Sequence, residues 1–266
     1  MNILMVTPNV VVGGAQKIML YLAKGLQDRG HQVVIYTTMV DHSKLPPWTK
    51  TLTYHVEDVP ILRPGGELAN FTAIDNVAVL AGRLARLRRG IARAVRDYDV
   101  DLVNPHNPPA NWLCSFLRAP VVWSCHNNPM AFYRNLRDGY VPLFPGKAGL
   151  HHRGLEAIYE GLDYLVIRHG IRAIVSSSRK IARGVHRIYG RRSEAIDFAF
   201  FDEHGHSGSA ASLAAKFEQM DQQGITMIQI GQLVEDKKPQ MAVDVLDRVR
   251  RRIPNARLVF AGDGTL

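Results

Sequence analysis

The fold is decided by residues 2–38, NILMVTPNVVVGGAQKIMLYLAKGLQDRGHQVVIYTT. An apolar run at 2–7 is followed by a loop that contains Gly13-Gly14. Over 15–27 the apolar residues recur every three or four positions, which predicts a helix, and a second apolar run follows at 31–38. A strand, a glycine loop, a helix and a strand in this order predict the first unit of a parallel α/β sheet.

The same alternation continues along the chain. Further strands are predicted at 52–57, 100–104, 120–124, 173–176 and 195–200, and helices at 73–97, 109–117, 154–169 and 178–189. This pattern predicts a doubly wound parallel sheet of the Rossmann-like type, in which ligands bind at the carboxyl ends of the strands. Residues 127–153, rich in Gly, Pro and aromatic residues, are predicted to form a loop excursion near that edge.

The composition changes near residue 202. Residues 202–213, DEHGHSGSAASL, are mostly small and polar, as in a linker. A second strand, helix and strand are then predicted at 225–230, 239–251 and 256–261. Because one helix cannot cover both faces of a parallel sheet, this second unit is predicted to be incomplete. The predicted domains are an N-terminal Rossmann-like domain at 1–201, a linker at 202–223 and part of a C-terminal domain at 224–266.

The overall composition restricts the class of protein. The 266 residues include 33 Lys and Arg against 24 Asp and Glu, a net charge of +9, and 46% are hydrophobic. These values are typical of a globular protein, and the positive charge favours anionic partners. No apolar stretch reaches the about 20 residues of a transmembrane helix, and no secretory signal is predicted. Two cysteines, Cys114 and Cys125, give no disulfide framework, which favours the cytoplasm.

Six motifs follow one another along the chain. They are Gly13-Gly14-Ala15-Gln16, Asp101-Leu-Val-Asn-Pro-His106, Val121-Val-Trp-Ser-Cys-His126, Ala173-Ile-Val-Ser-Ser-Ser178, Ile230-Gly-Gln-Leu-Val-Glu-Asp-Lys237 and Phe260-Ala-Gly-Asp-Gly264. In this order they resemble the motifs of glycosyltransferase family 4, whose members are retaining enzymes of the GT-B fold. The resemblance implies transfer of a hexose from a nucleotide-sugar donor to a glycan or lipid-linked acceptor. It implies no metal and no other cofactor, because the nucleotide-diphosphate sugar is the substrate.

The resemblance also assigns roles to residues. His106 is expected to contact the donor sugar near the reacting carbon, as the catalytic candidate, while His126 and Gln16 are expected to contact sugar or acceptor. The residues expected to bind the donor and its phosphates are Gly13, Gly14, Gly231, Gln232, Lys237, Gly262 and Gly264. Glycine allows a backbone N–H to approach a phosphate, and a helix N-terminus is electropositive, so the pair before the helix at 15–27 suits that role.

Each of these features has a simpler alternative. The glycine pair also fits an ordinary tight turn, and Lys237, with Lys238 beside it, also fits a solvated lysine. The two histidines also fit residues that cap a loop by hydrogen bonding. A zinc site built from the cysteines and histidines is not predicted, because the cysteines lack the spacing of a zinc knuckle.

The chain departs from the family pattern at several positions. Gln232 stands where the family has Arg, Asn104 stands in place of the first histidine of a pair, and the family's Asn-Gly turn is absent from 197–202. The family's Glu-x7-Glu motif would lie beyond Leu266. We therefore expect the chain as given to lack a complete donor site and to be inactive or nearly so. A nucleotide-sugar epimerase or hydrolase of the same fold, and a non-catalytic binding module, remain alternatives.

A basic segment lies within the predicted helix at 73–97. Four of its arginines, Arg83, Arg86, Arg89 and Arg93, alternate with apolar residues, and no acidic residue occurs between 82 and 96. Such a helix suits peripheral contact with an anionic membrane, at the inner face of the cytoplasmic membrane. It equally suits a crossover helix with its arginines in water. No nucleic-acid partner is expected, because no recognition module is present.

Overall fold

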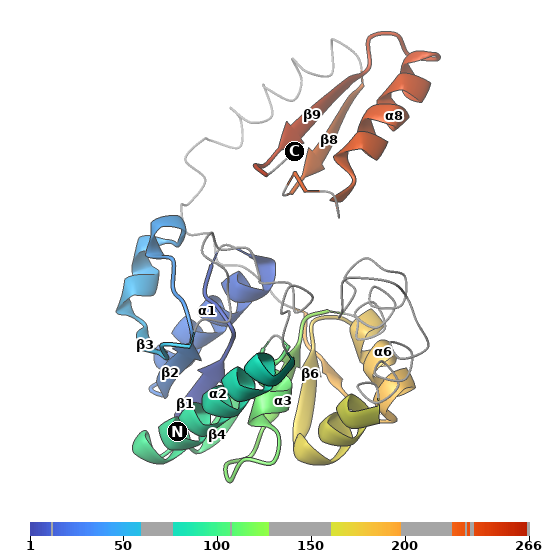
Figure 1. Cartoon of the computed structure of the whole chain (residues 1–266). Helices are drawn as coiled ribbons and strands as arrows, with labels where there is room; N and C mark the ends of the chain where they lie inside the picture. Colours follow the sequence, from blue (N-terminus) through green and yellow to red (C-terminus); the bar gives the residue numbers. More distant parts are fainter. Residues whose placement is uncertain are drawn as a thin grey trace. The chain divides into compact units, whose positions relative to one another are not determined.

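The protein folds into two compact units, Met1–Phe200 and Phe201–Leu266. The computed structural model shown in Figure 1 describes residues 1–11, 13–59, 77–106, 108–127, 161–197, 225–231, 233–234 and 237–264. Both units are built from parallel strands and helices, which confirms the predicted α/β class. The predicted linker at 202–223 and most of the predicted excursion at 127–153 lie outside the described residues.

The first unit contains one continuous run of parallel strands. They are β1 (Asn2–Val6), β2 (Gln32–Thr37), β3 (Thr53–Val56), β4 (Leu102–Pro105), β5 (Val122–Cys125), β6 (Ala173–Ser176) and β7 (Glu194–Ala195). Their order is β3-β2-β1-β4 and then β5-β6-β7, and a parallel bridge between Val103 and Val121 joins the two parts. The order reverses direction at β1, as in a doubly wound sheet, where the ligand crevice forms beside the carboxyl ends of the strands.

Helices connect these strands. They are α1 (Gly14–Gln27), α2 (Val77–Asp97), α3 (Ala110–Cys114), α6 (Arg179–Tyr189) and helical residues at 161–170, with short 3₁₀ segments η1 (His42–Lys44) and η2 (Pro47–Thr51). No helix in the described ranges is both long and apolar enough to cross a bilayer.

Most predicted boundaries agree with the structure within a few residues, but one helix is shorter. The helix predicted at 109–117 ends at Cys114, because Ser115 is extended and Phe116 takes a left-handed φ of 58°. The Phe116 N–H then bonds the carbonyl of Gly170 at 3.2 Å instead of a helical partner. The strand predicted at 195–200 pairs with β6 only at Glu194–Ala195 among the described residues.

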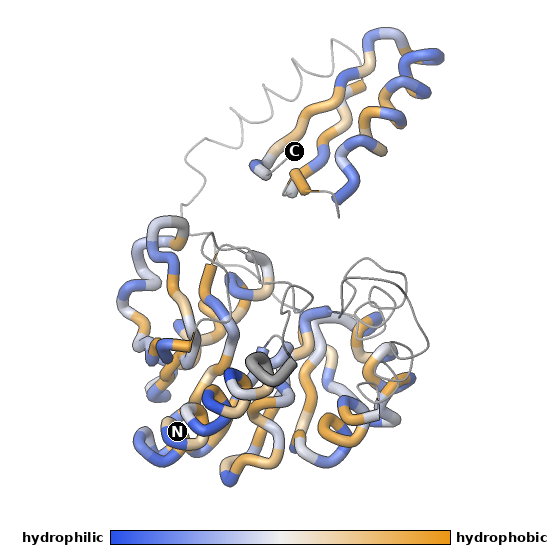
Figure 2. Tube along the Cα trace, viewed as in Figure 1, coloured by the Kyte–Doolittle hydropathy of each residue, from blue (hydrophilic) through white to orange (hydrophobic). Residues whose placement is uncertain are grey.

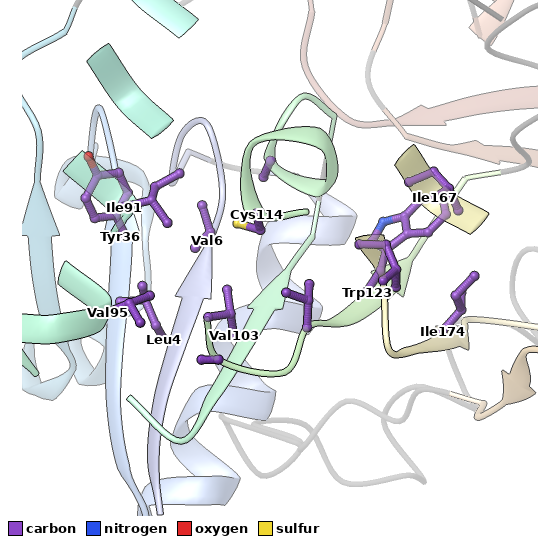
Figure 3. Close-up of a cluster of buried hydrophobic side chains, with 14 of the residues drawn as sticks. Leu4, Val6, Tyr36, Ile91, Val95, Val103, Cys114, Trp123, Ile167 and Ile174 are labelled. Atoms are coloured by element: carbon purple, nitrogen blue, oxygen red, sulfur yellow. The ribbon is translucent and has the colours of Figure 1, made fainter. Parts of the chain in front are cut away.

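The two faces of this sheet carry separate cores. On one face, α1 packs Met19, Leu20 and Ala23 against Ile3, Met5 and other residues of β1 and β2. The other face carries a larger cluster, to which α2, α3, the helix at 161–170 and α6 all contribute (Figure 3). Alternate residues of β1 point to opposite faces, so Leu4 and Val6 lie in the second cluster. Figure 2 shows the apolar residues concentrated along these strands, with hydrophilic residues on the outer sides of the helices.

The second unit is a single βαβ unit in its described part. It consists of β8 (Thr226–Ile230), α8 (Pro239–Arg250) and β9 (Arg257–Ala261), and the two strands pair in parallel. Pro239 and Ala256 are its buried residues within the described ranges. Ile228, Ile230 and Val259 are 47%, 82% and 40% exposed, so the described residues leave one apolar sheet face in water.

The glycines after β8 and β9 allow two loops to touch. A Cβ atom on Gly262, where φ is +158°, would lie 1.9 Å from the carbonyl oxygen of Gly231, and one on Gly264 would lie 2.0 Å from that of Leu233. Backbone hydrogen bonds join the same segments, from the Gly231 N–H to Ala261 and from the Leu233 N–H to Asp263. These glycines therefore have a structural role that does not depend on a ligand.

Candidate functional site

Three segments at the carboxyl edge of the first sheet meet. The loop after β1 begins at Thr7, His106 follows β4, and His126 follows β5. The His106 N–H donates to the carbonyl of Val6 at 3.0 Å, and Ser177, after β6, donates its hydroxyl to the carbonyl of His126 at 3.2 Å. The structure therefore brings His106 and His126 together at the edge where doubly wound sheets bind ligands.

Hydrogen bonds join the two histidines in a chain that ends inside the sheet. His126 Nε2 lies 2.8 Å from His106 Nδ1, and His106 Nε2 lies 2.8 Å from Asn104 Oδ1. The Asn104 amide then donates to the carbonyl of Val122 at 2.5 Å and to Ser124 Oγ at 2.9 Å. We call these residues, His126, His106, Asn104 and Ser124, the polar chain.

The chemistry of its donors and acceptors fixes the direction of the polar chain. The Val122 carbonyl can only accept, so the Asn104 atom beside it is the NH2 nitrogen and the other is the oxygen. That oxygen requires a proton on His106 Nε2, which leaves His106 Nδ1 as an acceptor. His126 Nε2 is then the donor to His106. His106 is therefore neutral, in a single tautomer, and His126 carries a proton on Nε2.

Burial keeps the histidines neutral. His106 is 1% exposed, and burial is the main cause that lowers its pKa well below 6.5, followed by the nearby His126. Burial also lowers the pKa of His126 to about 4. Both nitrogens of the His106 ring are engaged within the protein, so a sugar would meet His106 only by exchanging one of those bonds. His126 is only half-buried, and it lies closer to solvent than His106.

The glycine pair starts α1 beside the same edge. Gly13 is the N-cap and offers no side-chain cap, and the first turn contains no acidic residue. Gly14 is exposed, and a Cβ atom on it would meet no atom within 4 Å, so there is open space beside the first turn of α1. Gln16 donates to Asn9 Oδ1 at 3.0 Å and covers Gly13, where a Cβ would meet its Oε1 at 2.4 Å. The first N–H groups of a helix have no partner within the helix, and this end of α1 also carries the positive end of the helix dipole.

The other residues expected to bind the sugar donor and its phosphates belong to the second unit. Gly231, Gly262 and Gly264 form its loop contact, and Gln232 lies outside the described residues. Lys237 is exposed, and its carbonyl accepts from Gln229 Nε2 at 3.0 Å. Lys238 takes a left-handed φ of 48° and caps α8.

The arginines of α2 divide into two groups. Arg88 donates to the carbonyls of Leu113 and Ser115, both at 2.8 Å, and so fastens α2 to α3. Arg86, Arg89 and Arg93 are exposed, on the side of α2 opposite the buried Leu87, Ile91 and Val95. Arg83 is half-buried and lies one turn before Leu87, at the margin of the buried face. Arg93 also lies 3.4 Å from Glu57.

The cysteines are packing residues in this fold. Cys114 and Cys125 are both buried and free. Burial raises the pKa of both thiols, that of Cys125 to about 12, so neither is a ready metal ligand or nucleophile. Within the described ranges, no three metal-binding side chains gather together.

Sequence reasoning missed the part played by Asn104 and Ser124. In the sequence, Asn104 is distinguished only as the residue in place of a histidine. In the structure, it is 4% exposed and joins His106 to β5 through hydrogen bonds. One signal was available. Asn104 and His106 are two residues apart at a strand end, and such residues share a face of the sheet.

Comparison with known proteins supports the same fold. The family profile described as "Glycosyltransferase Family 4" matches residues 12–198. The solved structure of HepE from Anabaena in complex with UDP aligns with a TM-score of 0.63 and 15% identity, covering 100% of this chain and 62% of its own. WaaG, a glycosyltransferase involved in lipopolysaccharide biosynthesis, aligns with a TM-score of 0.63 and 14% identity, covering 99% of this chain and 64% of its own.

Sucrose-phosphate synthase from Thermosynechococcus elongatus gives a TM-score of 0.64 at 11% identity, covering 97% of this chain and 61% of its own. A search of curated protein sequences gave no match. At such low identities the structural likeness establishes the fold, which is GT-B. This chain spans about three fifths of the length of the solved proteins it resembles.

Proposed function

Since this chain belongs to glycosyltransferase family 4, we propose that it supplies the acceptor-side domain and part of the donor-side domain of an enzyme that transfers a hexose from a nucleotide sugar with retention. The observation that carries the proposal is the carboxyl edge of the first sheet. There, the N-terminus of α1 follows β1, and the two histidines of the polar chain follow β4 and β5. These three strands are neighbours in the sheet.

Each group at this edge suits one part of the reaction. The first N–H groups of α1, beside the open space at Gly14, would offer donors to the diphosphate as negative charge builds up on it. The polar chain presents His126 from a fixed tautomer, as a positioned contact for sugar or acceptor hydroxyls. We assign Lys237 to the diphosphate as well, because an ammonium is a compact counter-charge for phosphate.

The proposed reaction follows the family resemblance. The bond from the anomeric carbon to the diphosphate oxygen breaks, and its electrons stay on the diphosphate. The acceptor oxygen forms the new bond on the same face, which retains the configuration, and its proton passes to a diphosphate oxygen. This chain's residues hold the reactants in position, and no metal is needed for these steps.

The acceptor is proposed to bind mainly on the first unit. Lipid-linked acceptors would place the protein at the inner face of the cytoplasmic membrane, with Arg83, Arg86, Arg89 and Arg93 toward anionic headgroups. Vesicle sedimentation tests this part separately. Loss of binding on replacing Arg86 and Arg89 with glutamine, but not on replacing Lys24 and Arg29 of the α1 segment, would support it.

The donor part is tested by titrating nucleoside diphosphates of each base into the 266-residue chain. HepE was solved with UDP and with UDP-glucose, so UDP comes first. We expect Gly14→Val to weaken binding by about tenfold, because its side chain would cover the helix N-terminus. Gly82→Val is the matched control, since its Cβ position on α2 is equally empty.

The reaction itself is tested with UDP-glucose, with and without a set of glycan acceptors. From a longer form that completes the second unit, we expect an acceptor-dependent product with the anomeric configuration of the donor, seen by NMR, whereas we expect the 266-residue chain alone to be inactive or nearly so. Free glucose without acceptor would indicate a hydrolase, and an isomerised donor would indicate an epimerase. If neither this chain nor a longer form binds any nucleoside diphosphate or transfers sugar, the proposed function is wrong.

A further inference from the structure

A second edge of the first sheet carries an open groove of about 790 Å³. It lies between the second half of α6 and the amino ends of β6 and β7. Its lining residues are Arg172, Ala173, Ile174, Ala182, Arg183, His186, Arg187, Arg191, Arg192, Ser193 and Glu194. We call it the basic groove, because five of these residues are arginines and Glu194 is the one acid.

Four of the arginines have unoccupied guanidinium groups. Arg172, Arg183, Arg187 and Arg192 are exposed, and none of them makes a hydrogen bond or ion pair through its side chain with any described residue. Elsewhere in the same unit, some exposed charges are paired, as Lys24 is with Asp28 and Arg93 with Glu57. The groove therefore gathers positive charge that the described part of the protein does not neutralise.

The fifth arginine holds the groove in shape. Arg191 donates to the carbonyls of Ile167 at 3.1 Å, Arg168 at 3.3 Å and Arg172 at 2.9 Å, and also to that of Ile171. Its Nη1 and Nη2 groups both donate to backbone carbonyls, so it ties the end of the helix at 161–170 to the segment before β7. The helix α6 is also fixed at both ends, by the Ser178 cap and by Gly190 in the left-handed region.

The basic groove is distinct from the candidate sugar-transfer site. Arg172 precedes β6 and Arg192 precedes β7, whereas His106 and His126 follow β4 and β5. The strands run parallel, so the two sites lie at opposite ends of them, about 13 Å apart for four residues at about 3.3 Å each.

We propose that the basic groove binds a ligand with two or more closely spaced phosphate groups, at a site separate from that of the sugar donor. Guanidinium groups present paired N–H donors that match the oxygens of a phosphate, and several of them around one groove match clustered phosphates. The phosphates could come from a soluble polyphosphate or from the headgroup of an anionic lipid. The chemistry is the same, and the two sources are separated by experiment.

The experiment uses the 266-residue chain and inorganic tripolyphosphate, measured by calorimetry at constant ionic strength. In Arg183→Gln/Arg187→Gln we expect affinity to fall by about tenfold or more, because two charge-assisted contacts are lost. The matched control is Arg179→Gln/Lys180→Gln, which removes the same charge from the first turn of α6, outside the groove lining. We expect it to bind within about twofold of the parent.

A lysine variant separates geometry from charge. Arg183→Lys/Arg187→Lys keeps both charges but loses the forked donors, and we expect an affinity between those of the parent and the glutamine variant. Circular dichroism melting of each variant checks that the fold is retained. In parallel, sedimentation with phosphatidic acid vesicles identifies the source: loss of vesicle binding in the groove variant alone assigns the site to lipid headgroups.

The outcomes either support or overturn the proposal. Selective loss in the groove variant, with tripolyphosphate or with vesicles, supports it. Equal loss in the groove variant and the matched control would mean that only net charge matters, and the proposal would be wrong. It would also be wrong if the parent bound neither probe, or if the folded groove variant bound both as well as the parent.

Discussion

The units β1-α1-β2 and β8-α8-β9 share a topology but differ in burial. Four of the five residues of β1 are buried, and α1 buries Met19, Leu20, Tyr21 and Ala23. In β8, with the comparably apolar sequence TMIQI, no residue is buried, and α8 buries only Pro239. In both units the two strands are parallel, and five consecutive residues of one strand pair with five of the other.

The difference shows what a βαβ unit gains from its neighbours. β1 lies between β2 and β4 and is covered on one face by α1 and on the other by the larger core cluster. β8 pairs with β9 alone among the described residues. Local sequence therefore suffices to specify strand, loop and helix, whereas the stability of the strand depends on the layers around it.

The largest effect is expected for a truncation in β1. Leu4→Ala removes a fully buried side chain between β1, α2 and Val103, and should lower the free energy of unfolding by about 2–5 kcal/mol. Urea unfolding followed by tryptophan fluorescence measures it, because all three tryptophans lie in the first unit. A loss below about 1 kcal/mol would show that the site relaxes without a cavity.

The second prediction concerns the loop contact of the second unit. Gly262→Ala would bring a Cβ within 1.9 Å of the Gly231 carbonyl and strain a left-handed φ, for a cost of about 2–4 kcal/mol. Limited proteolysis should then cut residues 225–264 faster, while the first unit resists as before. Gly82→Ala is the control in the first unit, where the Cβ meets empty space on a helix and should stabilise slightly. Unchanged proteolysis of Gly262→Ala would contradict the loop contact.

The third prediction uses pH, because residues 225–264 contain no histidine. The pKa of His126 is about 4 in the folded chain against an ordinary 6.5, so the unfolded chain binds a proton first as the pH falls. Stability of the first unit should therefore fall between about pH 6.5 and 4, by up to about 1.4 kcal/mol per pH unit for this group.

Burial also lowers the pKa of His106, so this residue contributes to the same loss of stability as the pH falls. Urea unfolding at pH 7 and pH 5.5 measures the slope, and His126→Gln should reduce it. His169→Gln, on the exposed side of the helix at 161–170, serves as the control. A slope that His126→Gln leaves unchanged would show that His126 is not held neutral by the fold.

The smallest effect is expected at the last residue of β8, the counterpart of Val6 in β1. Ile230 is 82% exposed, so Ile230→Thr, which keeps the β-branch, should change the stability of that unit by less than about 0.5 kcal/mol. Thermal melting by circular dichroism together with the proteolysis rate measures it. A large loss would mean that this face is covered by another part of the protein in solution.

Much of the fold could be predicted from the sequence. The alternation of apolar runs and helical periods located β1, α1, β2, β6 and α8 within a residue or two, and all of these except β6 have a glycine or proline near a boundary. Phe116 shows the limit. Its left-handed conformation, which ends α3, depends on a hydrogen bond to Gly170, more than fifty residues away.

The candidate site could be predicted in part. The positions of His106 and His126 after strands indicated a shared edge, and the structure brings the two rings within hydrogen-bonding distance. The direction of the polar chain could not be predicted, since it depends on Val122 and Ser124 of the neighbouring strand. The basic groove was also missed, because its arginines come from three separate segments that meet only after β6 and β7 pair.

Arg191 has a consequence for local motion. One guanidinium group bonds the last turn of the helix at 161–170, the turn into β6 and the start of the segment that leads to β7. None of these segments can open without breaking bonds that hold the others, so they should exchange their amide hydrogens as one cooperative unit. An ion at the basic groove and an opening at the helix end would then be linked through a single side chain.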